Sequence, residues 1–306
     1  AVRRAAAADP AREKLTLRTP KRRLRRPKRI FGRKGIARRG EMAYNNRVRS
    51  EQRRAQFRAA EQEMGGISVL RIQSFSKTYA GGKKAVDDLT LTVQPGEIVG
   101  FIGHNGAGKS TTLRACAGVL DFTEGTIAID GHDVRREPVA AKRVTAFLPD
   151  NPDLYEFMTG VAFLNFIADL YDIPAKERTE RIAKYADAFE LTGNLGSAIG
   201  SYSHGMRQKL ALISAFMRQP KLMILDEPMV GLDPSAAHLM KGFLAELCAR
   251  SSSVFFSTHV LEVAEKLCDR IAIIKQGRLI RYDRTENVVG DSSLESVFLE
   301  LEAEKQ

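Results

Sequence analysis

The segment GHNGAGKST, residues 103–111, restricts the possible folds of this chain more than any other part of it. It follows the apolar run EIVGFIG and precedes apolar residues at helical spacing, which are Leu113, Cys116, Ala117 and Leu120. A glycine-rich loop between a buried strand and a helix lets successive backbone N–H groups point at phosphate oxygens. The order of strand, loop and helix therefore predicts a phosphate-binding loop (P-loop). A glycine-rich turn without a nucleotide is the alternative.

The residue types in this loop indicate which atoms would meet a nucleotide. The loop fits the pattern GxxxxGK[ST]. Lys109 supplies a positive charge for the β- and γ-phosphates and is a candidate catalytic residue, while the Ser110 hydroxyl is suited to Mg²⁺. The candidate nucleotide-binding residues of the loop are Gly103, His104, Asn105, Gly106, Ala107, Gly108, Lys109, Ser110 and Thr111.

Apolar runs recur after the loop and predict the fold class. Runs at residues 144–149, 222–228 and 254–259 have the composition of strands that are covered on both faces. Buried strands that alternate with helical patterns are typical of a parallel sheet in a three-layer α/β core. We therefore predict an α/β fold with a P-loop NTPase core.

Other patterns predict additions to this core. Strand-like segments at 67–75 and 89–93, the second with alternating apolar residues, predict an N-terminal antiparallel β subdomain. Residues 160–219 carry only helical patterns and predict an inserted α-helical subdomain, and residues 271–282 predict a hairpin around Gly277. The expected organisation is a basic extension over 1–66 and a folded domain over 67–306, with its helical subdomain over about 155–215 and a C-terminal segment over about 284–306.

Two carboxylates end the apolar run LMILDEP. Buried acids are costly unless they meet a cation, which makes Asp226 a candidate Mg²⁺ ligand and Glu227 a candidate general base for attack of water on the γ-phosphate. His259 ends the next apolar run and is a further candidate catalytic residue. Because the carboxyl ends of parallel strands share one edge of the sheet, we expect His259, Asp226 and the P-loop to lie together there. An acidic helix cap and a structural histidine are the alternatives.

Positive charge is concentrated at the beginning of the sequence. Residues 1–66 hold 17 Arg and 4 Lys against 6 acidic residues, a balance of +15, and the remaining residues carry −4. Such a segment buries too little apolar surface to offset its ordering entropy, so we expect it to be disordered, although a helix is possible from Met42 to Met64. An RNA-binding or anionic-lipid-binding patch, a solvated tail, and a start codon placed too early before Met64 are the open alternatives.

Cysteine content and hydropathy predict a cytoplasmic chain. Cys116, Cys248 and Cys268 are scattered, which fits reduced thiols better than disulfides or a zinc site. The sequence has no uninterrupted apolar run of membrane-spanning length and no signal-peptide core near its first residue.

The segment SYSHGM, residues 201–206, adds a motif of another kind. Ser203 is placed to cap the helix that follows, with Gly205 in its first turn. Together with the P-loop, the DE pair, GLDP and the strand-end histidine, the chain from residue 67 to about 300 resembles ABC-type ATPases, the ATP-binding subunits of ABC transporters. The resemblance implies ATP and Mg²⁺ as cofactors. It also implies a head-to-tail dimer in which the P-loop of one subunit and the signature helix of the other enclose each ATP.

The resemblance also assigns roles to single residues. Tyr79 matches the aromatic residue that stacks on adenine, although it could be a simple loop tyrosine. Asp233 matches the acid of the loop after the DE pair, and Asp233-Pro234 is also a suitable helix start. Asp150 stands where most members have a glutamine that contacts Mg²⁺ and the attacking water. The residues that the resemblance assigns to ATP binding outside the P-loop are Tyr79, Asp150, Ser203, Gly205 and Asp233.

The chain departs from the family pattern at Asp150 and at Tyr202, His204 and Met206 of the signature. Its C-terminal sequence and LPDNPDLYEFMTG are similar to the exporter branch. The resemblance therefore implies ATP hydrolysis that drives a separate membrane-spanning permease for export, from a peripheral position on the inner face of the cell membrane. The partners are that permease and a second ATPase subunit, identical or different, and nucleic acid is not expected. A soluble ABC protein that acts on ribosomes or nucleic acid through the basic tail is the alternative, and a switch GTPase is disfavoured because no NKxD motif follows.

Overall fold

The computed structural model describes residues 68–303, which belong to one of the two compact units of the chain, Gly66–Gln306. The predictions made for the basic extension at residues 1–66 lie outside the described residues, as does the first residue of the strand predicted at 67–75. Within the described part, no helix combines the length and the apolar character needed to cross a membrane.

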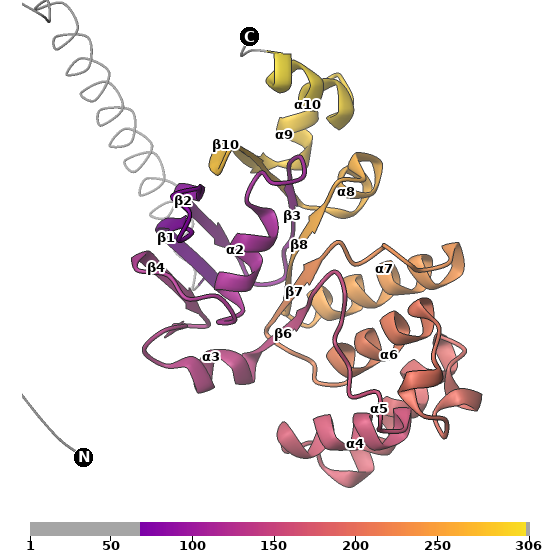
Figure 1. The fold of residues 1–306 in the computed structure, drawn as a ribbon. Coiled ribbons are helices and arrows are strands. Elements are labelled where there is room, and N and C mark those ends of the chain that lie inside the picture. The colour runs from indigo at the N-terminus through magenta and orange to yellow at the C-terminus, as the bar shows by residue number, and fades with distance from the viewer. Residues whose placement is uncertain (1–67, 304–306) are drawn as a thin grey trace, which may run out of the picture. The chain divides into compact units, whose positions relative to one another are not determined.

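A six-stranded, mostly parallel sheet forms the centre of the fold (Figure 1). The strand order is β10-β9-β3-β8-β7-β6, and β10 alone in this sheet runs antiparallel to its neighbour. Every residue of β3, β7 and β8 is buried, as their apolar runs predict. The strands are β3 (Ile98–Ile102), β6 (Thr145–Leu148), β7 (Leu222–Asp226), β8 (Ser253–Thr258), β9 (Arg270–Lys275) and β10 (Arg278–Arg284).

A second, antiparallel sheet precedes the P-loop and continues after it, in the order β2-β1-β4-β5. Its strands are β1 (Leu70–Thr78), β2 (Lys84–Val93), β4 (Glu124–Ile129) and β5 (His132–Asp133). β2 begins at Lys84, earlier than the strand expected at 89–93. Within β2, Asp88 has a left-handed backbone (φ 52°), and the register with β1 shifts nearby. That interruption breaks the alternation by which the longer strand could have been recognised.

Helices cover both faces of the central sheet (Figure 1). Residues 160–216 contain helices and no strand, which agrees with the predicted helical insertion. Two helix ends differ from the prediction. Val144 is the last residue of α3 and not the first of β6, and α2 ends at Cys116, before Leu120. The helices are α2 (Lys109–Cys116), α3 (Pro138–Val144), α4 (Gly160–Leu170), α5 (Ala175–Ala188), η1 (Thr192–Asn194), η2 (Ile199–Ser201), α6 (His204–Phe216), α7 (Pro234–Ala249), α8 (Leu261–Leu267), α9 (Thr285–Val289) and α10 (Leu294–Ala303).

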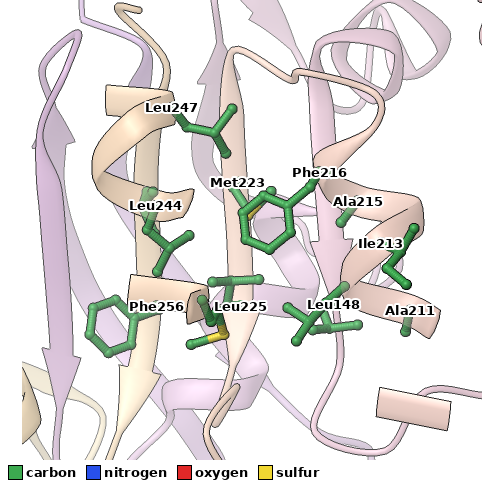
Figure 2. Close-up of a cluster of buried hydrophobic side chains, with 14 of the residues drawn as sticks. Leu148, Ala211, Ile213, Ala215, Phe216, Met223, Leu225, Leu244, Leu247 and Phe256 are labelled. Atoms are coloured by element: carbon green, nitrogen blue, oxygen red, sulfur yellow. The ribbon is translucent and has the colours of Figure 1, made fainter. Parts of the chain in front are cut away.

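The hydrophobic core has two parts, one on each face of the central sheet. Alternate residues of β7 show the division, because Met223 and Leu225 belong to one cluster and Leu222 and Ile224 to the other. Figure 2 shows the first cluster, in which strand residues such as Leu225 meet Phe216 of α6 and Leu244 and Leu247 of α7. The second cluster contains Leu113 and its neighbours on α2, together with the antiparallel sheet. The P-loop helix and the signature helix of this chain therefore pack on opposite faces of β7.

Candidate functional site

The P-loop is packed so closely against its surroundings that two of its glycines have no room for a side chain. A Cβ at Gly103 would lie 2.4 Å from the carbonyl oxygen of Ile274, and one at Gly108 would lie 2.5 Å from that of Ala85. Gly108 also has φ +113°, a conformation that side chains rarely allow. Gly277 of the β9–β10 turn donates its N–H to Ala107 over 2.9 Å. The backbone of the loop therefore packs directly against β2 and β9.

Lys109 connects the P-loop with the end of β7. Its side chain is only 6% exposed, and its ammonium donates to the carbonyl oxygens of Gly103 at 2.6 Å and His104 at 3.4 Å. The same ammonium lies 3.7 Å from Oε1 of Glu227. All three partners are oxygen atoms, and a charged ammonium that donates at 2.6 Å forms a strong contact, so a phosphate oxygen that binds Lys109 must compete with these partners.

Asp226 lies beside the beginning of α2, as expected for a residue at the carboxyl end of a parallel strand. Its Oδ1 accepts hydrogen bonds from Ser110 Oγ at 3.2 Å and from Ser257 Oγ at 2.6 Å. Asp226 is 1% exposed, and within residues 68–303 no group forms a hydrogen bond with its buried Oδ2. A buried carboxylate oxygen that lacks a partner is costly, and a hydroxyl beside it completes an oxygen-only donor set that suits Mg²⁺. The residues present therefore fit the metal that the P-loop pattern implies.

Glu227 lies between a lysine and a histidine. Its Oε2 is 2.9 Å from Nδ1 of His259 and also accepts the backbone N–H of His259 at 3.3 Å, while Oε1 faces Lys109. The backbone of Glu227 is left-handed, with φ 50°, which is uncommon for a residue other than glycine. Its N–H donates to Ser257 Oγ at 3.0 Å. The carboxylate thus has a fixed direction, with one oxygen toward the P-loop and the other toward β8.

Ser257 is a residue of this site that the sequence reasoning missed. Its hydroxyl donates to Asp226 and accepts from the N–H of Glu227, so one atom joins both members of the acidic pair. Ser257 is fully buried within the apolar run VFFSTH. A hydroxyl in the middle of a buried strand needs a partner, and that was the signal which could have identified it.

Tyr79 and Asp150 are both exposed. The Tyr79 hydroxyl lies 3.2 Å from Thr111 Oγ1 at the start of α2, so its ring stands beside the P-loop. Lys77 Nζ lies 5.5 Å from the centre of that ring. Asp150 is exposed two residues beyond β6, and within residues 68–303 it takes no part in the hydrogen bonds that join Ser110, Asp226 and Ser257. Its predicted contact with Mg²⁺ stays a prediction.

The signature segment forms the first turn of α6. Ser203 caps the helix by accepting the N–H of Met206 at 3.3 Å. The His204 ring lies against Gly231, since a Cβ at Gly231 would be 2.6 Å from the ring, and a Cβ at Gly205 would be 3.0 Å from the carbonyl oxygen of Gly231. These contacts leave no space between the start of α6 and the loop that follows the DE pair.

Two further contacts join α6 to that loop. Lys209 forms an ion pair with Asp233 at 2.9 Å, and Gln208 Nε2 donates to the carbonyl oxygen of Pro228 at 3.5 Å. Asp233 also caps α7 by accepting the N–H of Ala236 at 2.8 Å. The hydrogen bond from Lys209 and that of Ala236 hold the pKa of Asp233 below its ordinary value. Among the described residues, no hydrogen bond or ion pair links Ser203 or Gly205 to the P-loop of the same chain.

Comparison with known proteins gives one consistent result. A family model described as ABC transporter matches residues 86–230. The chain is 35% identical over 214 residues to the uncharacterized ABC transporter ATP-binding protein YhcH of Bacillus subtilis, a match that spans 70% of this chain and 69% of YhcH. It is 31% identical to the ABC-type transporter ATP-binding protein EcsA of the same organism, over 78% of this chain and 98% of EcsA.

Solved structures agree with the sequence comparisons. A structure described as the ATP-binding subunit of an ABC transporter is 32% identical, with a TM-score of 0.74, and the match covers 77% of this chain and all of that one. A dimeric ATP-binding cassette in a post-hydrolysis state, bound to ADP and Pi, is 23% identical with a TM-score of 0.65 over 71% of this chain and 98% of its own, and supports the fold alone. With the P-loop, the acidic pair and the signature segment in place, this chain belongs to the ATP-binding proteins of ABC transporters, which are ATP hydrolases.

Proposed function

We propose that this chain hydrolyses ATP in a head-to-tail dimer and so drives a separate transmembrane permease, in the direction of export. The observation that carries the proposal is the grouping of Asp226, Ser110 and Lys109 with Glu227, which offers a phosphate-binding loop and a general base at one edge of the sheet. The proposed direction of transport rests on the similarity of the C-terminal sequence and of LPDNPDLYEFMTG to exporters.

The contacts at this edge support a separate role in hydrolysis for each of these residues. Lys109 exchanges its carbonyl partners for phosphate oxygens, and Ser110 and Asp226 would hold a Mg²⁺ ion, which when bound would neutralise charge on the triphosphate. Glu227 takes a proton from the attacking water, and His259 keeps the Glu227 carboxylate in the required direction. Most of the rate enhancement then comes from positioning and charge stabilisation.

The position of the signature segment supports a role in the partner's site. Within one chain, α6 and α2 pack on opposite faces of β7, so Ser203 and Gly205 have no nucleotide of their own to serve. The first turn of α6 has a helix N-terminus with exposed N–H groups, which is suited to a phosphate. In a head-to-tail dimer this turn would face the γ-phosphate held by the other P-loop.

An aromatic surface on the helical subdomain supports a membrane partner. Phe157 is 84% exposed, and its ring lies 5.9 Å from that of Tyr155, which is also 5.9 Å from Phe166 on α4. Val161 and Leu170 of the same helix are exposed as well. Large exposed apolar side chains that gather in this way are typical of protein interfaces. We propose that the permease contacts this surface and holds the ATPase on the inner face of the cell membrane.

Complementation between two inactive variants tests the proposed dimer. Ser203→Arg damages the signature and leaves the P-loop intact, and Lys109→Ala does the reverse, so each homodimer should be nearly inactive. A one-to-one mixture forms heterodimers in which one site combines an intact P-loop with an intact signature. ATPase activity in the mixture should rise well above that of either variant alone.

Crosslinking gives the complementation test an independent reading. A chain that carries both Ser203→Cys and Asn105→Cys should be crosslinked by a bifunctional maleimide between position 203 of one subunit and position 105 of the other only when ATP is present. Heterodimers that form, bind ATP and show neither activity nor this crosslink would contradict the assignment. Crosslinking without activity would mean that both sites must work together, with the signature still placed across the dimer.

A further inference from the structure

The last helix of the described chain, α10, lies against the P-loop. The ring of Phe298 is 4.9 Å from the ring of His104, centre to centre, with an angle of 58° between the two planes. Phe298 is 7% exposed, so this face of α10 is covered. Figure 1 shows α9 and α10 near the end of β3 from which the P-loop leaves the sheet. Nearly 200 residues of sequence separate two rings that are in contact.

Both ends of α10 are fixed by hydrogen bonds to elements that flank the nucleotide edge. The N–H of Leu294 donates to Oε2 of Glu265 on α8 at 2.8 Å, and Lys275 Nζ at the end of β9 donates to the carbonyl oxygen of Leu301 at 2.9 Å. Between these two contacts Val297 is buried against the core. Phe298 is therefore carried on a helix that is held at its first and last turns.

The part of the P-loop that Phe298 reaches lies at the surface. His104, Asn105 and Gly106 are exposed, and apart from the adjacent residues no atom of residues 68–303 lies within 4 Å of the place where a Cβ of Gly106 would be. The carbonyl oxygen of His104 accepts the Lys109 ammonium at 3.4 Å and the N–H of Ala107 at 3.0 Å. A shift of residue 104 thus moves an acceptor of the lysine that would bind the phosphates.

We propose that Phe298 is a positioning residue for ATP binding, which holds His104 and through it the outer turn of the P-loop in the shape that receives the triphosphate. The inference rests on the proposed ATPase function and extends it to a helix outside the P-loop, the acidic pair and the signature segment. A preformed loop pays less ordering entropy when the nucleotide arrives, so loss of the ring contact should weaken ATP binding. It should leave the chemical step unchanged, because the ring contact of Phe298 is with His104 and not with the acidic pair.

Substitution of Phe298 in the full-length chain tests this inference by steady-state ATPase kinetics. Phe298→Leu keeps an apolar side chain and removes the ring, and we expect the KM for ATP to rise about 2- to 10-fold, the range that one aromatic contact provides, with kcat within about twofold. Phe298→Tyr keeps the ring and should restore the KM. Val297→Ala is the matched control, because it removes buried surface from the same helix and should leave the KM unchanged.

A double-mutant cycle separates positioning from general destabilisation. His104→Ala and Phe298→Leu should each raise the KM, and the double variant should be little worse than either, because both remove the same contact. Additive effects, an unchanged KM in Phe298→Leu, or an equal rise in Val297→Ala would overturn the proposal. Binding of a fluorescent ATP analogue is measured in parallel. If the wild type binds the analogue without hydrolysing ATP, the proposed function fails, and the role of Phe298 is then decided by the binding constants alone.

Discussion

Replacement of Glu227 by glutamine isolates the basicity of its carboxylate. Glutamine has the same shape, occupies the left-handed backbone at φ 50° about as well as glutamate, and can still meet His259. We therefore expect the fold to be retained. What is lost is the capacity to accept a proton from water. General-base catalysis contributes about 10²–10⁴ in rate, or about 3–5 kcal/mol of activation free energy, and turnover should fall by that factor.

ATP binding by Glu227→Gln should be equal to or tighter than that of the wild type. The negative charge on Glu227 lies 3.7 Å from the Lys109 ammonium, where the gross attraction is about 4 kcal/mol at an effective dielectric constant of 20. Solvation offsets most of this energy. Without the charge, Lys109 is freer to leave Glu227 for a phosphate oxygen, and one source of repulsion toward the triphosphate disappears.

Phosphate release under steady state measures turnover, and titration calorimetry with ATP measures binding. Glu262→Gln is the matched control, since it also removes one negative charge but from an exposed ion pair with Lys266, and it should leave both quantities unchanged. Turnover of Glu227→Gln within about tenfold of the wild type would refute the assignment. Asp150 and His259 would then be the next candidates for the base.

Three further predictions follow from the contacts described above. Ser257→Ala leaves Asp226 Oδ1 and the N–H of Glu227 short of a buried partner, so ATPase activity should fall at least about tenfold and require more Mg²⁺. Ser257→Thr keeps the hydroxyl and should retain most of the activity. An unaltered Mg²⁺ dependence in Ser257→Ala would argue against this role. Burial, and to a smaller extent the nearby charge of Asp269, raises the pKa of Cys248 to about 12. Alkylation by iodoacetamide at pH 8, measured by mass spectrometry, should therefore be about a thousandfold slower in the folded than in the unfolded chain. Equal rates would disprove the burial of this thiol. Burial alone would raise the pKa of Asp87, but hydrogen bonds from Lys84 and Arg278 outweigh it and leave the pKa below 3.8. The stability difference between wild type and Asp87→Asn, measured from urea midpoints, should therefore be full above about pH 4 and shrink as the pH falls toward 3. A constant difference would contradict the sign of the pKa shift.

The central sheet and the grouping at its edge followed from local patterns. Buried strands read as apolar runs, and the carboxyl ends of parallel strands meet, so Asp226, Glu227 and His259 could be placed near the P-loop without a structure. The helix caps at Ser203 and Asp233 were also predictable, because a cap depends on a few adjacent residues.

Contacts between distant segments could not be predicted in this way. The joining of both acids by Ser257 depends on the register of β7 with β8, and the pairing of Phe298 with His104 depends on the path of the chain after β10. The same is true of the start of β2, where a left-handed residue interrupts the alternation, and of Val144, whose apolar side chain fits the end of a helix as well as the start of a strand. Residue type alone does not decide such cases.

The left-handed backbone at Glu227 means that thermal stability and catalytic activity favour different residues at this position. A non-glycine residue in this conformation costs about 1 kcal/mol, and asparagine tolerates the same angles better. A laboratory selection for heat resistance alone would therefore favour Glu227→Asn, which relaxes the backbone and shortens the side chain away from Lys109 and His259. Consensus design or directed evolution of this chain needs an activity screen at residue 227, because the substitutions that strengthen the fold there are the ones that remove the base.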